Sequence, residues 1–268
     1  LLFSGGGIKG LVYPGVIKAL EELEILKNIE IYVGTSIGSL VITMLLLGYS
    51  SLEMEHFLLN FDLSSLKSID FLIFLKEYGL DRGEKMEYLV KRLLLAKGLS
   101  EDITLIDLFN ITGVEFIITT VNLNELKTVY LSYKTNPNLK LVTAIRMSIS
   151  IPFFYTPVKY NNKYYIDGAC MDNYPISLFT DRLDETIGFF ICSSSKKVID
   201  NFENIESYIF RVLCSLCEGN DYNCIRAYHN NTICLKLNNI SMLDFKISNE
   251  RIKEIINYGY KETLKNIT

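Results

Sequence analysis

The sequence has little histidine, proline or cysteine and no tryptophan: its 268 residues include 2 His, 5 Pro and 6 Cys. Disulfide scaffolds are short and rich in cysteine, so this sparse usage predicts reduced thiols and a cytoplasmic location. The chain also lacks an apolar run of the roughly 18 residues that a membrane span needs. Its longest run, residues 40–47, contains Thr43. We therefore expect no membrane span.

An excess of charge of one sign is also missing. Lys and Arg number 27 and Asp and Glu 31, the formal net charge is −4, and there is no basic run. Without a positive surface that could hold phosphates, we expect no nucleic-acid partner. Apolar residues are abundant: 49% of the chain is hydrophobic and 22% charged. This balance is typical of a globular protein with a large core and excludes a disordered chain.

Strand-like and helical segments alternate along the chain. Apolar residues have helical spacing over residues 10–26, residues 37–47 are apolar on nearly every face, and residues 84–96 and 250–264 are amphipathic. A helix that is apolar all round is expected between the layers of a large domain. The alternation predicts an α/β protein, a three-layer α/β/α sandwich with a largely parallel central sheet, in one domain over residues 1–268. The expected strands are residues 1–4, 30–33, 114–120, 128–133, 163–166, 186–192 and 233–235.

A glycine-rich segment, Gly5–Gly10 (GGGIKG), follows the first expected strand and begins a helix. Its spacing satisfies the dinucleotide-binding pattern G-x-G-x-x-G. That pattern needs an acidic residue at the end of the second strand, whereas Glu30 stands at its start. A Walker A loop is excluded because Lys9 is followed by Gly10 and not by Ser or Thr. Such a turn can instead direct several backbone N–H groups at one oxyanion, or it can simply allow close helix–strand packing.

The second expected strand ends in Gly34–Gly38 (GTSIG), a G-x-S-x-G sequence that leads directly into the apolar helix. A serine on so sharp a turn requires glycine two residues before and after it, because the backbones of strand and helix almost touch. Its hydroxyl then lies at a helix N-terminus, where the helix dipole stabilises the negative charge that forms during acyl transfer. The pattern predicts Ser36 as a nucleophile, with an ordinary helix-capping serine as the alternative.

A nucleophilic serine needs a base, and the candidates are the two histidines of the chain and two of its aspartates. His56 lies in an apolar helical stretch, where a packed surface histidine is expected. His229 follows the serine in a polar segment, in the chain order of hydrolase triads, and stays an alternative base. Asp167 comes directly after a strand-like run and precedes Gly168, so its carboxylate could take the serine proton directly. Asp172 is a second carboxylate, beside a segment with turn character.

Together these segments resemble the patatin-like phospholipases, in which a glycine-rich oxyanion loop, a G-x-S-x-G elbow and a D-G-[AG] aspartate occur in this order. The likeness extends over residues 2–175 and includes the segment Arg146–Phe154, whereas residues 192–268 match nothing specific. The resemblance implies the three-layer fold and a Ser36–Asp167 dyad that needs no metal or cofactor. It assigns the oxyanion hole to the backbone of Gly6, Gly7 and Ile8, with Lys9, Gly34, Gly38 and Gly168 in supporting positions.

The function predicted in this way is lipid acyl hydrolysis at a membrane or droplet surface, by a protein peripheral at membranes. Ser36, activated by Asp167, attacks a carboxylic ester of a phospholipid or acylglycerol, and a fatty acid is released. An acyl chain needs an apolar channel, for which residues 69–75 and 151–155 are candidates. Residues 69–75 are more simply explained as core, because an exposed run of this kind favours aggregation. The alternative function is a catalytically weak lipid-binding or interaction module on the same fold.

A metal site is not expected. The spacing of the C-terminal cysteines and histidine matches no familiar zinc pattern, and two thiols three residues apart in a helical stretch are usually buried side chains. The sequence contains no indication of the oligomeric state. The residues considered for a metal are Cys214, Cys217, Cys224, His229 and Cys234.

Overall fold

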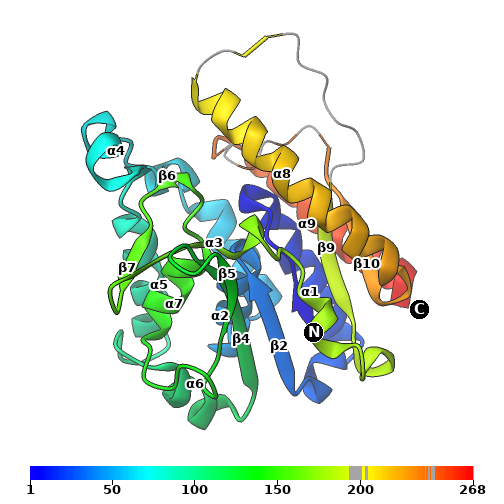
Figure 1. Ribbon diagram of the computed structural model, residues 1–268. Helices are drawn as coiled ribbons and strands as arrows, with labels where there is room; N and C mark the ends of the chain where they lie inside the picture. The colour runs from blue at the N-terminus through cyan, green and yellow to red at the C-terminus, as the bar shows by residue number, and fades with distance from the viewer. Residues whose placement is uncertain (193–200, 203–204, 239, 241, 243–244, 268) are drawn as a thin grey trace.

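The computed structural model describes residues 1–192, 201–202, 205–238, 240, 242 and 245–267. An eight-stranded sheet with the strand order β10-β9-β1-β2-β4-β8-β7, and with β5 paired to β4, runs through the centre of the molecule (Figure 1). The strands from β10 to β4 are parallel, whereas β5 and β8 run antiparallel to β4, and β7 runs antiparallel to β8. The bounds are β1 (Leu2–Phe3), β2 (Ile31–Thr35), β4 (Glu115–Asn122), β5 (Lys127–Leu131), β7 (Val158–Tyr160), β8 (Lys163–Asp167), β9 (Gly188–Cys192) and β10 (Thr232–Lys236).

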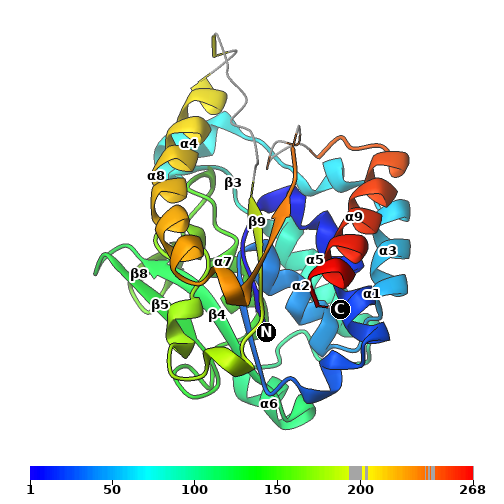
Figure 2. The same ribbon diagram turned by 90° about the vertical axis from the view of Figure 1, so that its right-hand side faces the viewer.

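Helices cover both faces of the sheet, which Figure 2 shows nearly edge-on. Buried residues of α1, α2, α3, α5, α6, α7 and α9 form one large hydrophobic cluster on one face. A smaller cluster lies on the other face, where residues of α8 pack against it. The prediction of a three-layer α/β/α sandwich with a largely parallel sheet is thereby confirmed. The helices are α1 (Tyr13–Glu22), α2 (Ile37–Leu46), α3 (Ser51–Asn60), α4 (Phe71–Glu77), α5 (Glu84–Ala96), α6 (Leu105–Thr112), α7 (Leu141–Ser148), α8 (Ile205–Ala227) and α9 (Asn249–Ile267).

Successive residues of the central strands pack in the hydrophobic clusters on opposite faces of the sheet. Phe3 and Phe189 belong to the large cluster, whereas their chain neighbours Leu2 and Phe190 belong to the small one. Successive side chains of a strand point to opposite faces, so a strand buried on both sides is apolar at consecutive positions. This is why the central strands could be found in the sequence as short continuous apolar runs.

All seven expected strands are present, and three more were missed. The missed strands are β7 and the pair β3 (Gly79–Asp81) and β6 (Phe153–Tyr155), which form a separate two-stranded sheet. Each has three residues, too few for a recognisable alternation of apolar and polar side chains. The expected helix over residues 10–26 differs in detail, since it begins as a 3₁₀ turn, η1 (Gly7–Val12), that continues into α1.

The expectation that residues 69–75 belong to the core is wrong. These residues lie in and before α4, where Phe71, Leu72 and Leu75 are exposed and Ile73 alone of the four is buried. Helix α4 has only seven residues and packs on the small β3–β6 sheet at one end of the molecule, so one residue suffices to attach it. Among the described residues, no helix is both long and apolar enough to cross a membrane.

The C-terminal part of the chain completes the sheet. Strand β9 pairs with β1, and β10 extends the same edge. Helix α9 packs against α1 and buries Ile252, Ile255 and Ile256. Residues beyond the family-like segment therefore contribute strands and core to the same sheet that carries the glycine loop and the serine.

Candidate active site

The candidate nucleophile lies on a strained turn between β2 and α2. Ser36 has a φ of 53° and a ψ of −125°, a backbone conformation that non-glycine residues rarely adopt. The turn is as tight as the sequence pattern requires. A Cβ on Gly34 would lie 2.6 Å from the Cα of Ser39, and a Cβ on Gly38 would lie 2.3 Å from the carbonyl oxygen of Phe3. Glycine at these two positions allows strand and helix to approach closely enough to form the elbow.

Asp167 meets Ser36 along one edge of β4. Strand β2 pairs with β4 up to Thr119, and β8 pairs with the same edge from Thr120, where it ends at Asp167, because β5 occupies the other edge of β4. The hydroxyl of Ser36 donates a hydrogen bond of 2.6 Å to Oδ2 of Asp167, and Oδ1 accepts one of 2.9 Å from the N–H of Ala169. Both side chains are buried, Ser36 at 4% and Asp167 at 2% exposure. Gly168 lets this strand end lie against Thr119.

Burial changes the acidity of the aspartate. Removal from water disfavours a carboxylate, and this effect raises the pKa of Asp167 to about 7, although the hydrogen bonds from Ser36 and Ala169 act in the opposite direction. A carboxyl with a pKa near 7 can accept a proton at neutral pH and release it again in the next step.

Two serines, one at the end of α7 and one two residues beyond it, hold both members of the pair. The hydroxyl of Ser148 accepts a 2.9 Å hydrogen bond from the N–H of Ser36 and donates one of 2.7 Å to the carbonyl of Thr119. The carbonyl of Ser150 accepts a 2.9 Å hydrogen bond from the N–H of Asp167. Sequence reasoning included these serines only as part of the family-like segment Arg146–Phe154 and assigned them no role. Their contacts join residues far apart in the chain, which spacing does not reveal.

A buried arginine braces this segment. Arg146 is 2% exposed, and its guanidinium donates to the hydroxyl of Ser150 and to the carbonyls of Arg82 and Thr156. It also lies over the ring of Tyr155, 5.0 Å from the centroid. Burial lowers the pKa of the guanidinium, with the nearby acidic groups acting in the opposite direction. Arg146 thereby ties the end of α7 to the β3–β6 sheet.

The glycine loop lies next to the elbow because β1 and β2 are adjacent. The N–H of Gly5 donates a 2.8 Å hydrogen bond to Oδ1 of Asn173, and the N–H of Ile8 donates one of 2.9 Å to the carbonyl of Met242. No acceptor among the described residues meets the N–H groups of Gly6 and Gly7. Of the three predicted oxyanion donors, Ile8 is thus the one whose N–H has a described acceptor. Asn173, in the segment with turn character that follows Asp172, tethers the loop.

Lys9 is buried within η1 rather than exposed at the edge of the glycine loop. Its backbone N–H donates a 3.2 Å hydrogen bond to the carbonyl of Gly6 and tightens the loop. A lysine that is 8% exposed is better suited to hold the loop than to attract substrates from solution.

The two histidines do not approach Ser36. His56 is exposed on α3. Thr232 of β10 is in register with Val33 of β2 across the two strands between them. His229 comes three residues before Thr232, whereas Ser36 comes three residues after Val33. His229 therefore precedes the start of β10 whereas Ser36 follows the end of β2, and β9 and β1 lie between these two strands, about 14 Å across the sheet at about 4.8 Å per strand.

The remaining polar candidates also have other partners. Asp172 accepts a 2.6 Å hydrogen bond from the hydroxyl of Tyr130. Burial raises the pKa of Asp172, while that hydrogen bond lowers it. Within the described part of the chain, no group of three or more His, Cys, Asp or Glu residues could hold a metal ion.

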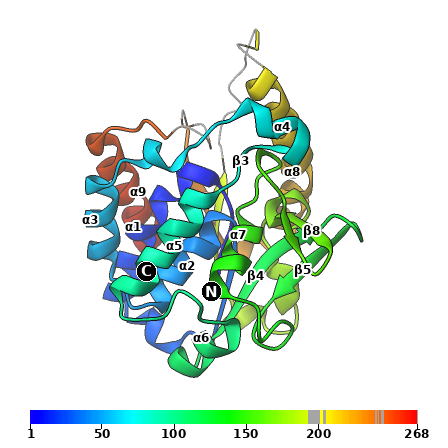
Figure 3. The same ribbon diagram turned by 90° about the vertical axis from the view of Figure 1, so that its left-hand side faces the viewer.

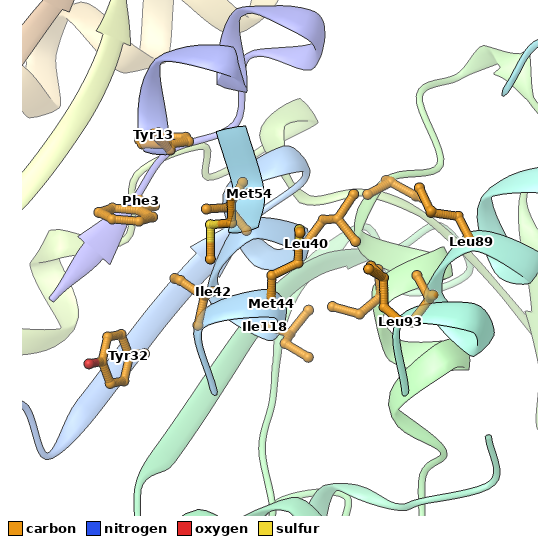
Figure 4. Close-up of a cluster of buried hydrophobic side chains, with 14 of the residues drawn as sticks. Phe3, Tyr13, Tyr32, Leu40, Ile42, Met44, Met54, Leu89, Leu93 and Ile118 are labelled. Atoms are coloured by element: carbon orange, nitrogen blue, oxygen red, sulfur yellow. The ribbon is translucent and has the colours of Figure 1, made fainter. Parts of the chain in front are cut away.

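A narrow apolar cavity of about 110 Å³ begins at Ser36 and continues between α2 and α5. Figure 4 shows Leu40 and Met44 of α2 facing Leu89 and Leu93 of α5, and all four side chains line the cavity. From Ser36 to Met44 the helix rises about 12 Å at 1.5 Å per residue. Of the two candidate channel segments, residues 151–155 contribute to the wall, whereas residues 69–75 do not. Ile151 and Tyr155 are the contributing residues of that segment, and Met242 and Phe245 line the cavity beside the glycine loop.

Comparison with known proteins agrees with this geometry. A family model described as "Patatin-like phospholipase" matches residues 1–180. An uncharacterized protein of Acanthamoeba polyphaga mimivirus is 29% identical over 279 residues, which cover 100% of this chain and 93% of that protein. "Probable lipid hydrolase 463L" of Invertebrate iridescent virus 6 is 30% identical over 181 residues, 66% of this chain and 62% of that protein.

Two solved bacterial structures share the fold. VipD from Legionella pneumophila has a TM-score of 0.63 at 16% identity, and the match covers 99% of this chain and 66% of that one. The type III effector ExoU of Pseudomonas aeruginosa has a TM-score of 0.56 at 13% identity, and the match covers 99% of this chain and 52% of that one. The chain thus spans about two thirds of one structure and half of the other.

Proposed function

Because the chain belongs to the patatin-like phospholipase family, we propose that it is a lipid acyl hydrolase in which Ser36 and Asp167 form a catalytic dyad. The observation that carries the proposal is the 2.6 Å hydrogen bond from the Ser36 hydroxyl to a buried carboxylate, at the entrance of an apolar cavity. The likeness to a probable viral lipid hydrolase supports the same substrate class.

In the first step Asp167 accepts the hydroxyl proton as Ser36 Oγ attacks the ester carbonyl. The carbonyl oxygen becomes an oxyanion, and the N–H groups of Gly6 and Gly7, in the loop after the strand next to β2, are the donors that could stabilise it. When the tetrahedral intermediate collapses, the bond to the alcohol breaks and Asp167 returns the proton to the leaving oxygen. Ser36 then carries the acyl chain as an ester.

In the second step water replaces the alcohol. Asp167 takes a proton from the water, whose oxygen attacks the acyl ester, and the same two N–H groups stabilise the second oxyanion. Collapse of this intermediate returns the proton to Ser36 Oγ and releases the fatty acid. Both steps balance with one serine and one carboxyl, and a pKa of about 7 suits Asp167 to both directions of proton transfer.

The cavity favours a substrate with a long acyl chain. Its walls come mainly from aliphatic and aromatic side chains, and it begins at Ser36. An ester carbonyl at Ser36 would place its acyl chain along α2 between Leu40 and Leu89. We therefore propose phospholipids or acylglycerols at a membrane or droplet surface as substrates.

The two alternatives fit the site less well. A lipid-binding module without catalysis would not need a strained serine hydrogen-bonded to a buried carboxylate, since both features lower stability. A nucleotide-binding site would need the glycine loop to face a polar ligand, whereas Gly7, Ile8 and Gly10 line the apolar cavity.

The test combines covalent labelling with product analysis. A fluorophosphonate probe should label the wild-type protein and the Ser215→Ala variant, in which an exposed serine of α8 is replaced, but not Ser36→Ala. On a panel of defined phospholipids and triacylglycerol, wild type and Ser215→Ala should release fatty acid and Ser36→Ala should not. Labelling that persists in Ser36→Ala, or release of no fatty acid from any lipid of the panel, would contradict the proposal.

A further inference from the structure

Five large apolar side chains are exposed together around α4. Phe71, Leu72 and Leu75 are 71%, 83% and 85% exposed, and Tyr78, which ends the helix, is 62% exposed. Phe153 of the neighbouring β6 strand is 44% exposed. We call these residues the apolar patch. Single exposed apolar residues are ordinary on protein surfaces, whereas a group of large ones marks a surface that binds something apolar.

The apolar patch is held in place by the body of the protein. Ile73 is buried beneath α4, and the ring of Phe74 lies 6.5 Å from the ring of Phe153. Phe153 has a φ of 66°, which is costly for a bulky residue and persists only where the surroundings impose it. The aromatic side chain is thus kept at the surface by a strained backbone.

The position of the apolar patch relates it to Ser36. Figures 1 and 3 show α4 at the end of the molecule toward which the central parallel strands run, and Ser36 directly follows the end of β2. The connection is also direct along the chain. Ile151 and Tyr155, two residues on either side of Phe153, line the acyl cavity, and so does Leu66, five residues before Phe71. The surface of the apolar patch and the wall of the cavity are built from the same two segments.

The charge around the apolar patch indicates the kind of surface that it fits. Residues 67–85 carry four basic and four acidic side chains, so the segment is neutral. A neutral apolar surface gains little from anionic headgroups, and insertion into a zwitterionic lipid layer would depend on apolar contact. The basic residues are Lys67, Lys76, Arg82 and Lys85, and the acidic residues are Asp70, Glu77, Asp81 and Glu84.

We propose that the apolar patch inserts into the surface of a zwitterionic phospholipid bilayer, with Phe71, Leu72 and Leu75 among the acyl chains. Bound in this way, the end of the molecule that carries Ser36 faces the lipid, and a substrate reaches the cavity past Phe153 without crossing water. The insertion itself stands on the exposed residues, and the delivery of substrate rests on the proposed function.

Vesicle binding tests the insertion without the chemistry. All proteins carry Ser36→Ala so that the lipid is not consumed, and they are mixed with phosphatidylcholine vesicles and separated by flotation. The double variant Leu72→Glu/Leu75→Glu should bind about 10²-fold more weakly, because two leucines that leave water are replaced by charges. Both positions are highly exposed, and Glu and Leu have similar helix propensity, so folding should be unaffected.

The matched control is Leu52→Glu/Ile111→Glu, which makes the same change at two exposed helical positions, 67% and 55%, away from the apolar patch. Ile111 lies on α6, at the opposite end of the molecule (Figure 1). The control should bind vesicles like the parent. Raising the salt from about 0.1 M to about 0.5 M should also leave binding nearly unchanged, since apolar insertion is not screened.

Equal binding by the parent and the Leu72→Glu/Leu75→Glu variant would overturn the inference. The inference would also be overturned if the parent sedimented as a dimer and the variant as a monomer, because the apolar patch would then contact a second copy of the chain.

An activity measurement separates this inference from the proposed function. With Ser36 intact, Leu72→Glu/Leu75→Glu should lose vesicle hydrolysis and keep wild-type turnover of a short soluble ester. A wild type that binds vesicles and hydrolyses neither substrate would leave the insertion standing and refute the proposed function.

Discussion

The proposed role of Asp167 has a distinctive consequence for the pH dependence of activity. Burial raises the pKa of this carboxyl from its ordinary value of 3.8 to about 7. Below that pH the folded protein keeps the carboxyl protonated, and a protonated carboxyl cannot accept the Ser36 proton. The rate on a short soluble ester should therefore rise about tenfold per pH unit up to about pH 7 and be constant above it.

Stability should change in the opposite direction. Between pH 3.8 and about 7, the unfolded chain loses the Asp167 proton while the folded chain keeps it, so the free energy of unfolding falls as the pH rises. At 1.36 kcal/mol per pH unit, the interval from pH 5 to pH 7 corresponds to about 3 kcal/mol. Asn has no proton to lose. The stability of Asp167→Asn relative to wild type should therefore increase by about 3 kcal/mol between pH 5 and pH 8.

Urea unfolding of wild type and Asp167→Asn at pH 5 and pH 8 measures this difference, because effects of the substitution that do not depend on pH cancel.

In the same preparations the turnover of Asp167→Asn should be lower than that of wild type by a factor on the order of 10²–10⁴. The matched control is Asp172→Asn, whose carboxyl is held by Tyr130, and a second is His229→Ala; both should stay near wild type. A relative stability that is the same at both pH values would refute the desolvated carboxylate. A larger loss in His229→Ala than in Asp167→Asn would make the histidine the base.

Three further substitutions test the geometry around the dyad. Gly38→Ala should lower the free energy of unfolding by about 2 kcal/mol or more, because its Cβ would lie 2.3 Å from the Phe3 carbonyl oxygen; a wild-type urea midpoint would contradict the tight elbow. Ser148→Ala removes the acceptor of the Ser36 N–H, so kcat should fall about tenfold, with KM and the pH profile unchanged. A shifted pH profile would instead connect Ser148 to the proton transfer. Met44→Trp fills the far part of the cavity, so the ratio of kcat/KM for long-chain to short-chain esters should fall at least about tenfold, and an unchanged ratio would place the acyl chain elsewhere.

The parts of the site that the sequence predicts are those whose geometry is local. Gly34, Ser36 and Gly38 lie within five residues, and the steric need for glycine on both sides of the serine is visible in the pattern. The central strands could be found because burial on both faces makes every position apolar. Sequence position also made Asp167 a candidate, but it left His229 open as the base. The sheet register separates the two, since one lies at the end of the strands near Ser36 and the other at the opposite end.

The residues that sequence reasoning missed act between distant segments. Ser148 reaches Ser36 across 112 positions and Asn173 reaches Gly5 across 168, and neither residue type differs from the serines and asparagines that form ordinary caps and turns. The error over residues 69–75 has a different origin. An apolar run has the same composition whether it is buried in a core or inserted in lipid, so composition alone does not distinguish the two environments.

Three features of the proposed active site and of the apolar patch lower the stability of the folded protein. The strained backbone of Ser36, the desolvated carboxyl of Asp167 and the positive φ of Phe153 each raise the free energy of the folded chain. The large hydrophobic cluster, built from seven helices and the central strands, supplies the stabilising burial that offsets these costs. Two of these features lie in the dyad and the third lies in the apolar patch. We therefore expect Ser36→Gly and Asp167→Asn to stabilise the protein at pH 8 while removing activity, and a loss of stability in both would mean that neither position is strained.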